Sequence, residues 1–164
     1  MAGLALAVDG TLEPGVRHAL TPAITALADR LGHRFTDLSL LAEAVSHRSA
    51  IAEGLTGPHS YERLEFLGDR VLGLIVADML LTAYPGAEEG ELARRLNALV
   101  RTETCADVAG EIDIGGALII GESEKRSNGR AKPAILADAC EAVIAAIYRD
   151  GGIEAARRFV ERHW

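Results

Sequence analysis

The stretch that decides the fold is YERLEFLGDRVLGLIVADMLLTAY, residues 61–84. We expect Ser60 to cap a helix that begins here, and Pro85 and Gly86 to end it after Tyr84. At 1.5 Å per residue, a helix of roughly 25 residues is about 37 Å long, the width of a small domain. This segment is therefore the predicted central helix of the protein.

Three acidic side chains, Glu62, Glu65 and Asp69, share one face of this helix. At 100° per residue they lie away from the apolar stripe. The ordinary interpretation is a solvated face. Gly68 and Gly73 argue against it, because each costs the helix about 1 kcal/mol relative to alanine, so we expect another segment to approach the backbone closely. The apolar stripe consists of Leu64, Leu67, Val71 and Ile75.

A second acidic pair, Asp138 and Glu141, stands in the otherwise apolar run AILADACEAVIAAI, residues 134–147. Residues three apart are neighbours on one helix face. Burying two carboxylates among alanines costs several kcal/mol each unless a cation or hydrogen-bond donors meet them. If this face meets the acidic face of the central helix, Glu65 and Asp69 complete a cage of carboxylate oxygens suited to a hard divalent ion. Magnesium is the expected occupant.

Helix-capping signals place the other elements. Thr21 and Pro22 predict the start of a helix that Gly32 ends, and Thr36 predicts the cap of the next, over residues 36–50. Helix-like segments follow at residues 88–100 and 101–112. We expect an exposed loop at residues 124–132, then a helix from Pro133 to Gly151 and Gly152, and a final amphipathic helix to residue 164.

Composition indicates one all-α domain over residues 21–164, preceded by a flexible arm at residues 1–20. Of the 164 residues 49% are hydrophobic but only 4% aromatic, which favours close packing of helices with small and aliphatic side chains. Neither cysteine belongs to a CxxC pair and the histidines lack zinc-type spacing, so a structural zinc site is not expected. With neither a secretory signal nor a transmembrane stretch, the sequence predicts a cytoplasmic protein without membrane contact.

Two segments carry a family resemblance. YERLEFLGDRVLG resembles the signature of the ribonuclease III family, and ILADACEAVIAAIYRDGG resembles that family's second catalytic segment. With VSHRS upstream and EEGELARRLNALV between them, the similarity covers residues 23–164. Two departures concern packing: Cys140 stands where relatives often have a larger apolar side chain, and Ala145 where glycine is common.

The resemblance implies an all-helical endonuclease domain that cleaves double-stranded RNA, leaves 5′-phosphate and 3′-hydroxyl ends, and acts in the processing of rRNA and mRNA. It implies Mg²⁺ as the cofactor, with Mn²⁺ as a substitute, and it gives Asp69 and Glu141 catalytic roles, with Glu62 in an outer acidic cluster. The implied metal ligands are Glu65, Asp69, Asp138 and Glu141.

The resemblance also implies a homodimer, in which Phe66 is the knob that enters a pocket of the partner; the alternative for Phe66 is an ordinary core position. Members of this type usually append a double-stranded-RNA-binding domain, and we expect this chain to be the nuclease domain without it. That expectation fits a formal charge of −7, which disfavours strong RNA binding by this segment alone. Weak candidates for RNA contact, each of which is more often merely solvated, are His47, Arg48, Lys125, Arg126, Arg130 and Lys132.

Two alternative functions remain open. A catalytically inactive RNA-binding relative would keep the helices and lose ligands, whereas all four ligand positions are intact here. A metal-dependent hydrolase of other substrates fits the acidic pairs but not the detailed signature.

Overall fold

The fold is all-helical. The computed structural model describes residues 21–57 and 59–164, so the predicted arm at residues 1–20 lies outside the described residues. Within them, the only β-pairing is an isolated bridge between Ser46 and Ile119. None of the helices in this range is both long and apolar enough to cross a bilayer. The helices are α2 (Pro22–Leu31), α3 (Leu38–Ala44), α4 (Arg48–Ala52), α5 (Glu62–Ala83), α6 (Glu89–Leu99), α7 (Thr102–Glu111), α8 (Ile114–Ala117), α9 (Glu122–Arg126), the 3₁₀ turn η1 (Gly129–Ala131) and α10 (Pro133–His163).

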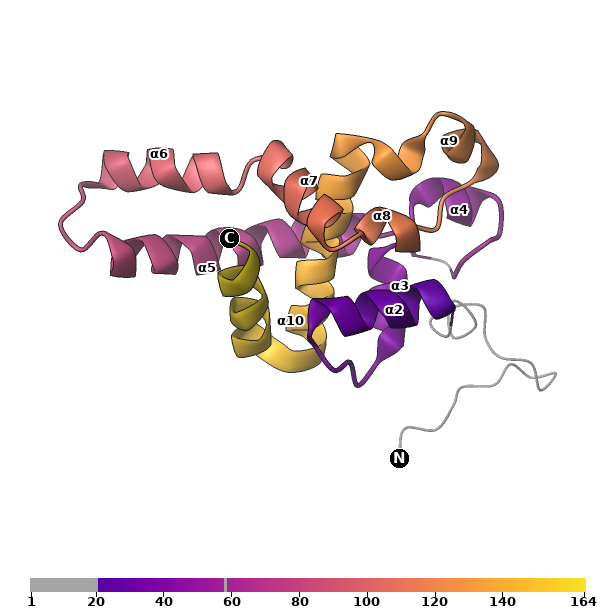
Figure 1. The fold of residues 1–164 in the computed structure, drawn as a ribbon, viewed down its shortest axis with the longest axis horizontal. Coiled ribbons are helices and arrows are strands. Elements are labelled where there is room, and N and C mark those ends of the chain that lie inside the picture. The colour runs from indigo at the N-terminus through magenta and orange to yellow at the C-terminus, as the bar shows by residue number, and fades with distance from the viewer. Residues whose placement is uncertain (1–20, 58) are drawn as a thin grey trace.

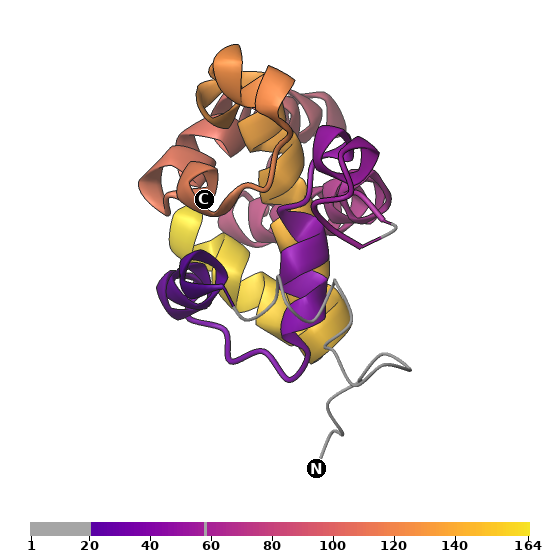
Figure 2. The same cartoon turned by 90° about the vertical axis from the view of Figure 1, so that its right-hand side faces the viewer.

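Helices α5 and α10 form the centre of the domain. Helix α10 packs against α5 and also against α7 and α3, so its apolar run is covered on several sides (Figures 1 and 2). Leu72 and Ile75 of α5 and Ile144 and Ile147 of α10 are fully buried. Beyond this crossing, α5 continues with α6 alongside it as an arm (Figure 1). The prediction of a long central helix is confirmed.

The capping signals of the first helices are partly confirmed. The Thr21 hydroxyl accepts a hydrogen bond from the N–H of Ile24 at 3.4 Å, and Gly32 ends α2 with φ 66°. The predicted Thr36 cap is wrong: Asp37 caps α3, because its carboxylate accepts the N–H of Ser39 at 2.9 Å. The N–H of Thr36 instead donates to the carboxylate of Asp150 at 3.0 Å.

The single helix predicted over residues 36–50 is divided into α3 and α4. Ser46 and His47 leave the helical path to pair with the strand-like segment at Ile119, where the N–H of His47 donates to the Ile119 carbonyl at 2.9 Å.

Helix α5 also begins differently from the prediction. Ser60 does not cap it; its hydroxyl bonds the carboxylate of Glu62 at 3.1 Å, and no side chain caps the helix start.

Helix α10 begins at Pro133 as expected and changes direction at Gly152, whose φ of 76° and ψ of −177° are not helical. The segment after the bend turns back toward the arm (Figure 1), and the indole N–H of Trp164 donates to the Leu99 carbonyl at 2.8 Å. Arg157 forms an ion pair with Asp78 of α5 at 2.8 Å. The segment after the bend is therefore bonded to α5 and to the last residue of α6.

The loop predicted at residues 124–132 is ordered instead. It contains the end of α9 and the turn η1, because distant groups hold it: Glu53 accepts the N–H of Glu122 at 3.0 Å at the start of α9. Locally, Lys125 pairs with Glu122 at 2.6 Å, and Lys132 pairs with Glu124.

Candidate active site

The site is built where α5 crosses α10. A β-carbon added at Gly68 would collide with the carbonyl oxygen of Glu141, so the two backbones meet there. The expectation that another segment approaches Gly68 is confirmed. The same expectation for Gly73 is wrong within this chain, since nothing lies within 4 Å of a β-carbon at that position. Gly73 is two turns beyond Phe66, on the same face of α5, and nothing in the described part of the chain comes close to it there.

This crossing brings the four predicted ligands into electrostatic contact. Burial raises the pKa of Glu141 to about 7, and the negative charges of Asp69, Glu65 and Asp138 raise it as well. Burial also raises the pKa of Glu65, and the charge of Asp138 on the other helix adds to this effect. The pKa of Asp138 is raised too, mainly by burial. The acids of α5 and α10 therefore repel one another across the crossing.

The four side chains do not close into the expected cage. Across residues 21–57 and 59–164, no three His, Cys, Asp or Glu side chains come close enough together to hold an ion. The Asp69 carboxylate pairs with Arg70 instead, and Glu62, the outer acid, lies 3.7 Å from Arg48. The ligand set stays a prediction.

The donor set nevertheless fits magnesium. Four partly buried carboxylates, three of which (Glu65, Asp138 and Glu141) have a raised pKa, offer hard oxygen donors and an excess of negative charge that a divalent cation would offset. The residues that could hold the ion are Glu65, Asp69, Asp138 and Glu141.

An open pocket lies beside these acids, and Glu65 and Asp138 form part of its lining. His47 is 9% exposed, and its Nδ1 lies 2.7 Å from the Ser49 hydroxyl. Burial lowers the pKa of His47 despite the acids nearby. The Arg48 side chain is 77% exposed at the rim, and Lys132 also lines the pocket.

The remaining candidates for RNA contact do not line this pocket, and they differ in their bonding. Arg130 donates to the carbonyl oxygens of Gly115 and Gly116, at 2.8 and 3.1 Å. The side chain of Arg126 is exposed and makes no hydrogen bond or ion pair within the described part of the chain. Arg126 is thus available for a ligand, whereas Arg130 supports the fold.

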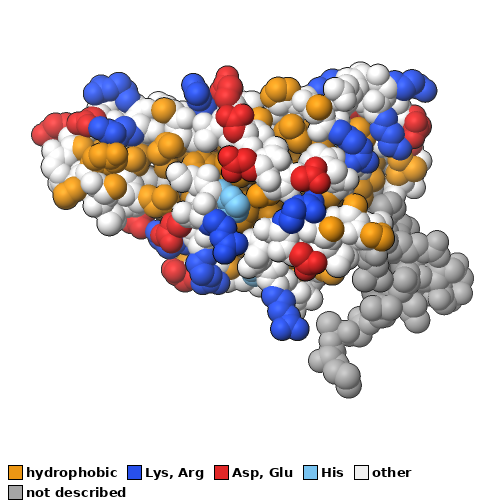
Figure 3. Space-filling model, in the orientation of Figure 1, with side chains coloured by type: hydrophobic (Ala, Val, Ile, Leu, Met, Phe, Trp, Pro, Cys, Tyr) orange, Lys and Arg blue, Asp and Glu red, His pale blue; other side chains and the backbone are white. Residues whose placement is uncertain are grey.

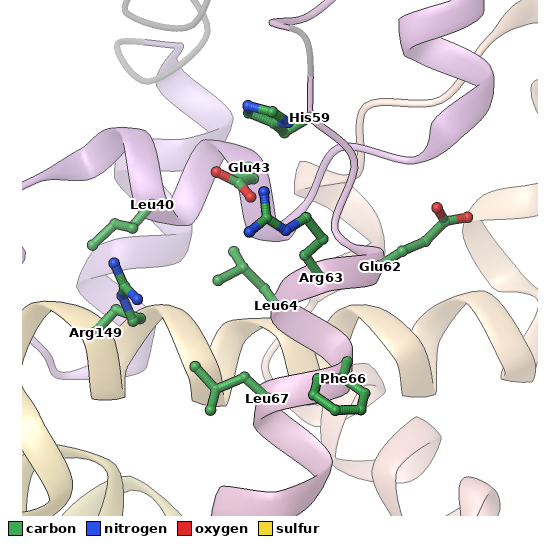
Figure 4. A pocket seen from close by; sticks show the side chains of 9 residues that line it. All are labelled: Leu40, Glu43, His59, Glu62, Arg63, Leu64, Phe66, Leu67 and Arg149. Atoms are coloured by element: carbon green, nitrogen blue, oxygen red, sulfur yellow. The ribbon is translucent and has the colours of Figure 1, made fainter.

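Phe66 is not a core residue, since 66% of it is exposed, and the Arg70 guanidinium stacks on its ring 4.5 Å from the centroid. Leu74 and Leu81 of α5 are also more than half exposed. Hydrophobic side chains form a band along the α5–α6 arm on the face shown in Figure 3. Phe66 adjoins a pocket between α5, α3 and α10 that Leu40, Leu67 and Arg149 help to line (Figure 4).

Two features near the acids were not found from the sequence. The thiol of Cys105 on α7 lies 3.9 Å from Oε1 of Glu141, and burial raises the pKa of this thiol to about 12. The ion pair of Glu124 with Lys132 lies in the same pocket as Asp138. No local spacing signal connects Cys105 with Glu141, because they are 36 residues apart.

Residues 37–164 match the family described as Ribonuclease-III-like. The chain belongs to the ribonuclease III family. It is 53% identical over 145 residues to Ribonuclease 3 of Dinoroseobacter shibae, covering 88% of this chain and 62% of that one. It is 55% identical over 141 residues to Ribonuclease 3 of Rhodobacter capsulatus, covering 86% and 60%.

Solved structures agree with this assignment. The nuclease domain of ribonuclease III from Campylobacter jejuni, described with a region involved in dimer formation, is 34% identical with a TM-score of 0.78. That match covers 86% of this chain and 98% of the domain. Dicer from Giardia shares the fold, with a TM-score of 0.65 at 23% identity over 91% of this chain and 20% of Dicer. The chain spans 62% and 60% of the length of the two Ribonuclease 3 relatives.

Proposed function

We propose that this chain is the catalytic domain of an endoribonuclease that hydrolyses double-stranded RNA with Mg²⁺, leaving 5′-phosphate and 3′-hydroxyl ends. The observation that carries the proposal is the crossing of α5 and α10, where carboxylates from both helices raise the pKa of Glu141 to about 7. Family membership and the Ribonuclease 3 relatives support the choice of substrate.

In this mechanism Glu65, Asp69, Asp138 and Glu141 hold the ion. When bound, a divalent ion polarises the scissile phosphate and lowers the pKa of a coordinated water. Asp69 and Glu141 are the catalytic pair, one from each helix, and the contact of Gly68 with the Glu141 backbone fixes the spacing of the two helices. Partial burial of these acids strengthens their interaction with a cation relative to open solvent.

RNA approaches over the pocket beside the acids, where the exposed Arg48 would meet phosphates, and where Lys132 would have to leave its ion pair with Glu124 to do so. A net charge of −7 limits the affinity of this domain for a polyanion, so productive binding of long duplexes depends on further contacts. Processing of rRNA and mRNA in the cytoplasm is the cellular role that follows from this activity.

The proposal includes a homodimer. The exposed ring of Phe66 and the pocket beside it supply a knob and a socket on one surface, and a two-fold axis would place each knob in the partner's socket. The Campylobacter nuclease domain, which has a region involved in dimer formation, supports this arrangement.

The test is incubation of the purified chain with a perfect RNA duplex and Mg²⁺ at low salt, followed by analysis of product ends. Cleavage should require the metal and fall at least 100-fold in Glu141→Gln and in Asp69→Asn, because each change removes a ligand. Glu154→Gln, on the exposed face of α10 beyond the bend, is the matched control and should cut normally. Binding without cutting would support the inactive relative, and no effect on RNA would support a hydrolase of other substrates.

A further inference from the structure

Glu141 is held from two sides. Its backbone is pressed against Gly68 of α5, and its carboxylate faces Cys105 of α7, with Sγ 3.9 Å from Oε1. Helix α7 packs against α10 directly, so this second contact lies on a main interface of the fold. The Cys105 thiol also lies 4.0 Å from the Val100 carbonyl oxygen, a second acceptor.

Cys105 is the hydrogen-bond donor nearest to this carboxylate. Cys105 is fully buried, and in the described residues no other donor bonds the side chain of Glu141. The other polar groups around the carboxylate are acids, which repel it. A thiol is a weak donor, yet within the described part of the chain it is the one donor that can favour one orientation of the carboxylate over another.

We propose that Cys105 is a positioning residue, whose thiol orients the carboxylate of Glu141 for metal binding. This inference rests on the proposed function, because it assigns Glu141 as a ligand. Groups that hydrogen-bond a metal-binding side chain without touching the metal fix the orientation of that side chain. Their loss typically weakens metal binding by about 10- to 100-fold. A long thiol contact belongs at the lower end of that range.

The chain supplies a matched control. Cys140 is adjacent to Glu141 in sequence and fully buried, but its thiol forms no hydrogen bond to that carboxylate among the described contacts. Cys140→Ala therefore removes the same atoms from the core as Cys105→Ala while leaving the orienting contact in place. Cys105→Ser keeps a donor at the site.

The first test measures binding of Mn²⁺ and of Mg²⁺ by calorimetry in the absence of RNA. Affinity should fall about tenfold in Cys105→Ala, stay within about threefold in Cys105→Ser and not change in Cys140→Ala. If the unmodified protein and Cys105→Ala bound the metal ions with equal affinity, the role of Cys105 would be overturned, but the proposed function would not. Failure of the unmodified protein to bind either ion would overturn the proposed function and the inference with it.

The second test needs no metal and no stable Cys105→Ala protein. In Cys140→Ala, Cys105 is the sole thiol, and its S–H infrared stretch should lie below that of an unbonded thiol. Adding Glu141→Ala should move the stretch back to higher frequency. A stretch that does not respond to Glu141→Ala would show that Cys105 merely fills space, and would overturn the inference.

Discussion

Gly68 of α5 lies against the carbonyl oxygen of Glu141 of α10, at a separation that leaves no space for a β-carbon. Gly68→Ala must push the two helices apart, and we expect a loss of about 3 kcal/mol in the free energy of unfolding together with loss of metal binding. Urea denaturation and calorimetry measure the two effects. Gly110→Ala on α7, where nothing lies within 4 Å, should instead raise stability by up to about 1 kcal/mol. Equal behaviour of both variants would contradict the close contact.

The raised pKa of Glu141 predicts a pH-dependent penalty in the metal-free protein. Its pKa is 4.5 when unperturbed and about 7 in the fold, so its contribution to stability is complete below pH 4.5 and is lost as pH rises to about 7. With a chelator at pH 8, Glu141→Gln should be more stable than the unmodified protein by about 1 to 2 kcal/mol, allowing for solvent screening.

Thermal unfolding measured from pH 4 to pH 8 checks this. The two proteins should have similar stability at pH 4, and Mg²⁺ at pH 8 should stabilise only the protein that retains Glu141. A constant difference across the pH range would mean that Glu141 is not repelled by its neighbours.

Asp150 stabilises the fold at a distance from the acidic crossing. Its side chain is only 3% exposed, and it accepts the N–H groups of Thr36 and Asp37 and lies 2.7 Å from Nε2 of His33. Burial alone would raise the pKa of Asp150, but these hydrogen bonds outweigh it and hold the pKa below its usual value of 3.8. Asp150→Asn should lower stability by about 2 kcal/mol at pH 7.

Because the folded pKa of Asp150 is depressed, its contribution is present above pH 3.8 and is lost as pH falls through the folded pKa. The difference between Asp150→Asn and the unmodified protein should therefore shrink in acid. Chemical denaturation at pH 7 and at pH 3 measures it, and a difference that grew in acid would refute the assignment.

Phe66 should control dimerisation without affecting the fold. The exposed ring contributes little to the core, so we expect Phe66→Ala to keep its thermal stability at low protein concentration and to dimerise at least tenfold more weakly. Sedimentation velocity over a range of concentrations measures this. Leu55→Ala, at an exposed leucine outside α5, is the control. An unchanged dimer in Phe66→Ala would remove this face from the proposed interface.

Arg126 and Arg130 should separate RNA contact from support of the fold. Arg126→Ala should leave the stability of the fold unchanged. It should make the slope of log affinity for duplex RNA against log salt concentration shallower by about one, because one phosphate contact is lost. Arg130→Ala should lower stability by about 1 to 2 kcal/mol, because it removes the hydrogen bonds to the Gly115 and Gly116 carbonyls. Fluorescence anisotropy measures RNA affinity, and thermal unfolding measures stability. If Arg126→Ala lowered stability and Arg130→Ala lowered only RNA affinity, the roles assigned to the two arginines would be wrong.

Local patterns predicted the all-helical class and the elements whose signals are contained in their own residues. Thr21, Pro22 and Gly32 mark α2, and Pro133 starts α10. The contact at Gly68 was also predictable, because a glycine inside an apolar helix weakens that helix and is favoured where a neighbouring backbone needs the space of a β-carbon.

The predictions that failed depend on partners distant in sequence. Asp37 caps α3 in place of Thr36, whose N–H donates to Asp150, 114 residues away. Ser46 leaves the helix to pair with Ile119, and Glu53 holds the start of α9 in a stretch that looked like a loop. The orientation of the acids and the position of Cys105 behind Glu141 likewise follow only from how the helices cross.

The bend at Gly152 has a stereochemical meaning. With φ 76° and ψ −177°, its backbone adopts the mirror image of an extended L-residue, and no atom would obstruct a side chain there. The obstacle to substitution is handedness alone and not space. Every ribosomally incorporated chiral residue is strained in this conformation. The return of the chain from Asp138 and Glu141 toward the arm thus depends on the one amino acid without chirality.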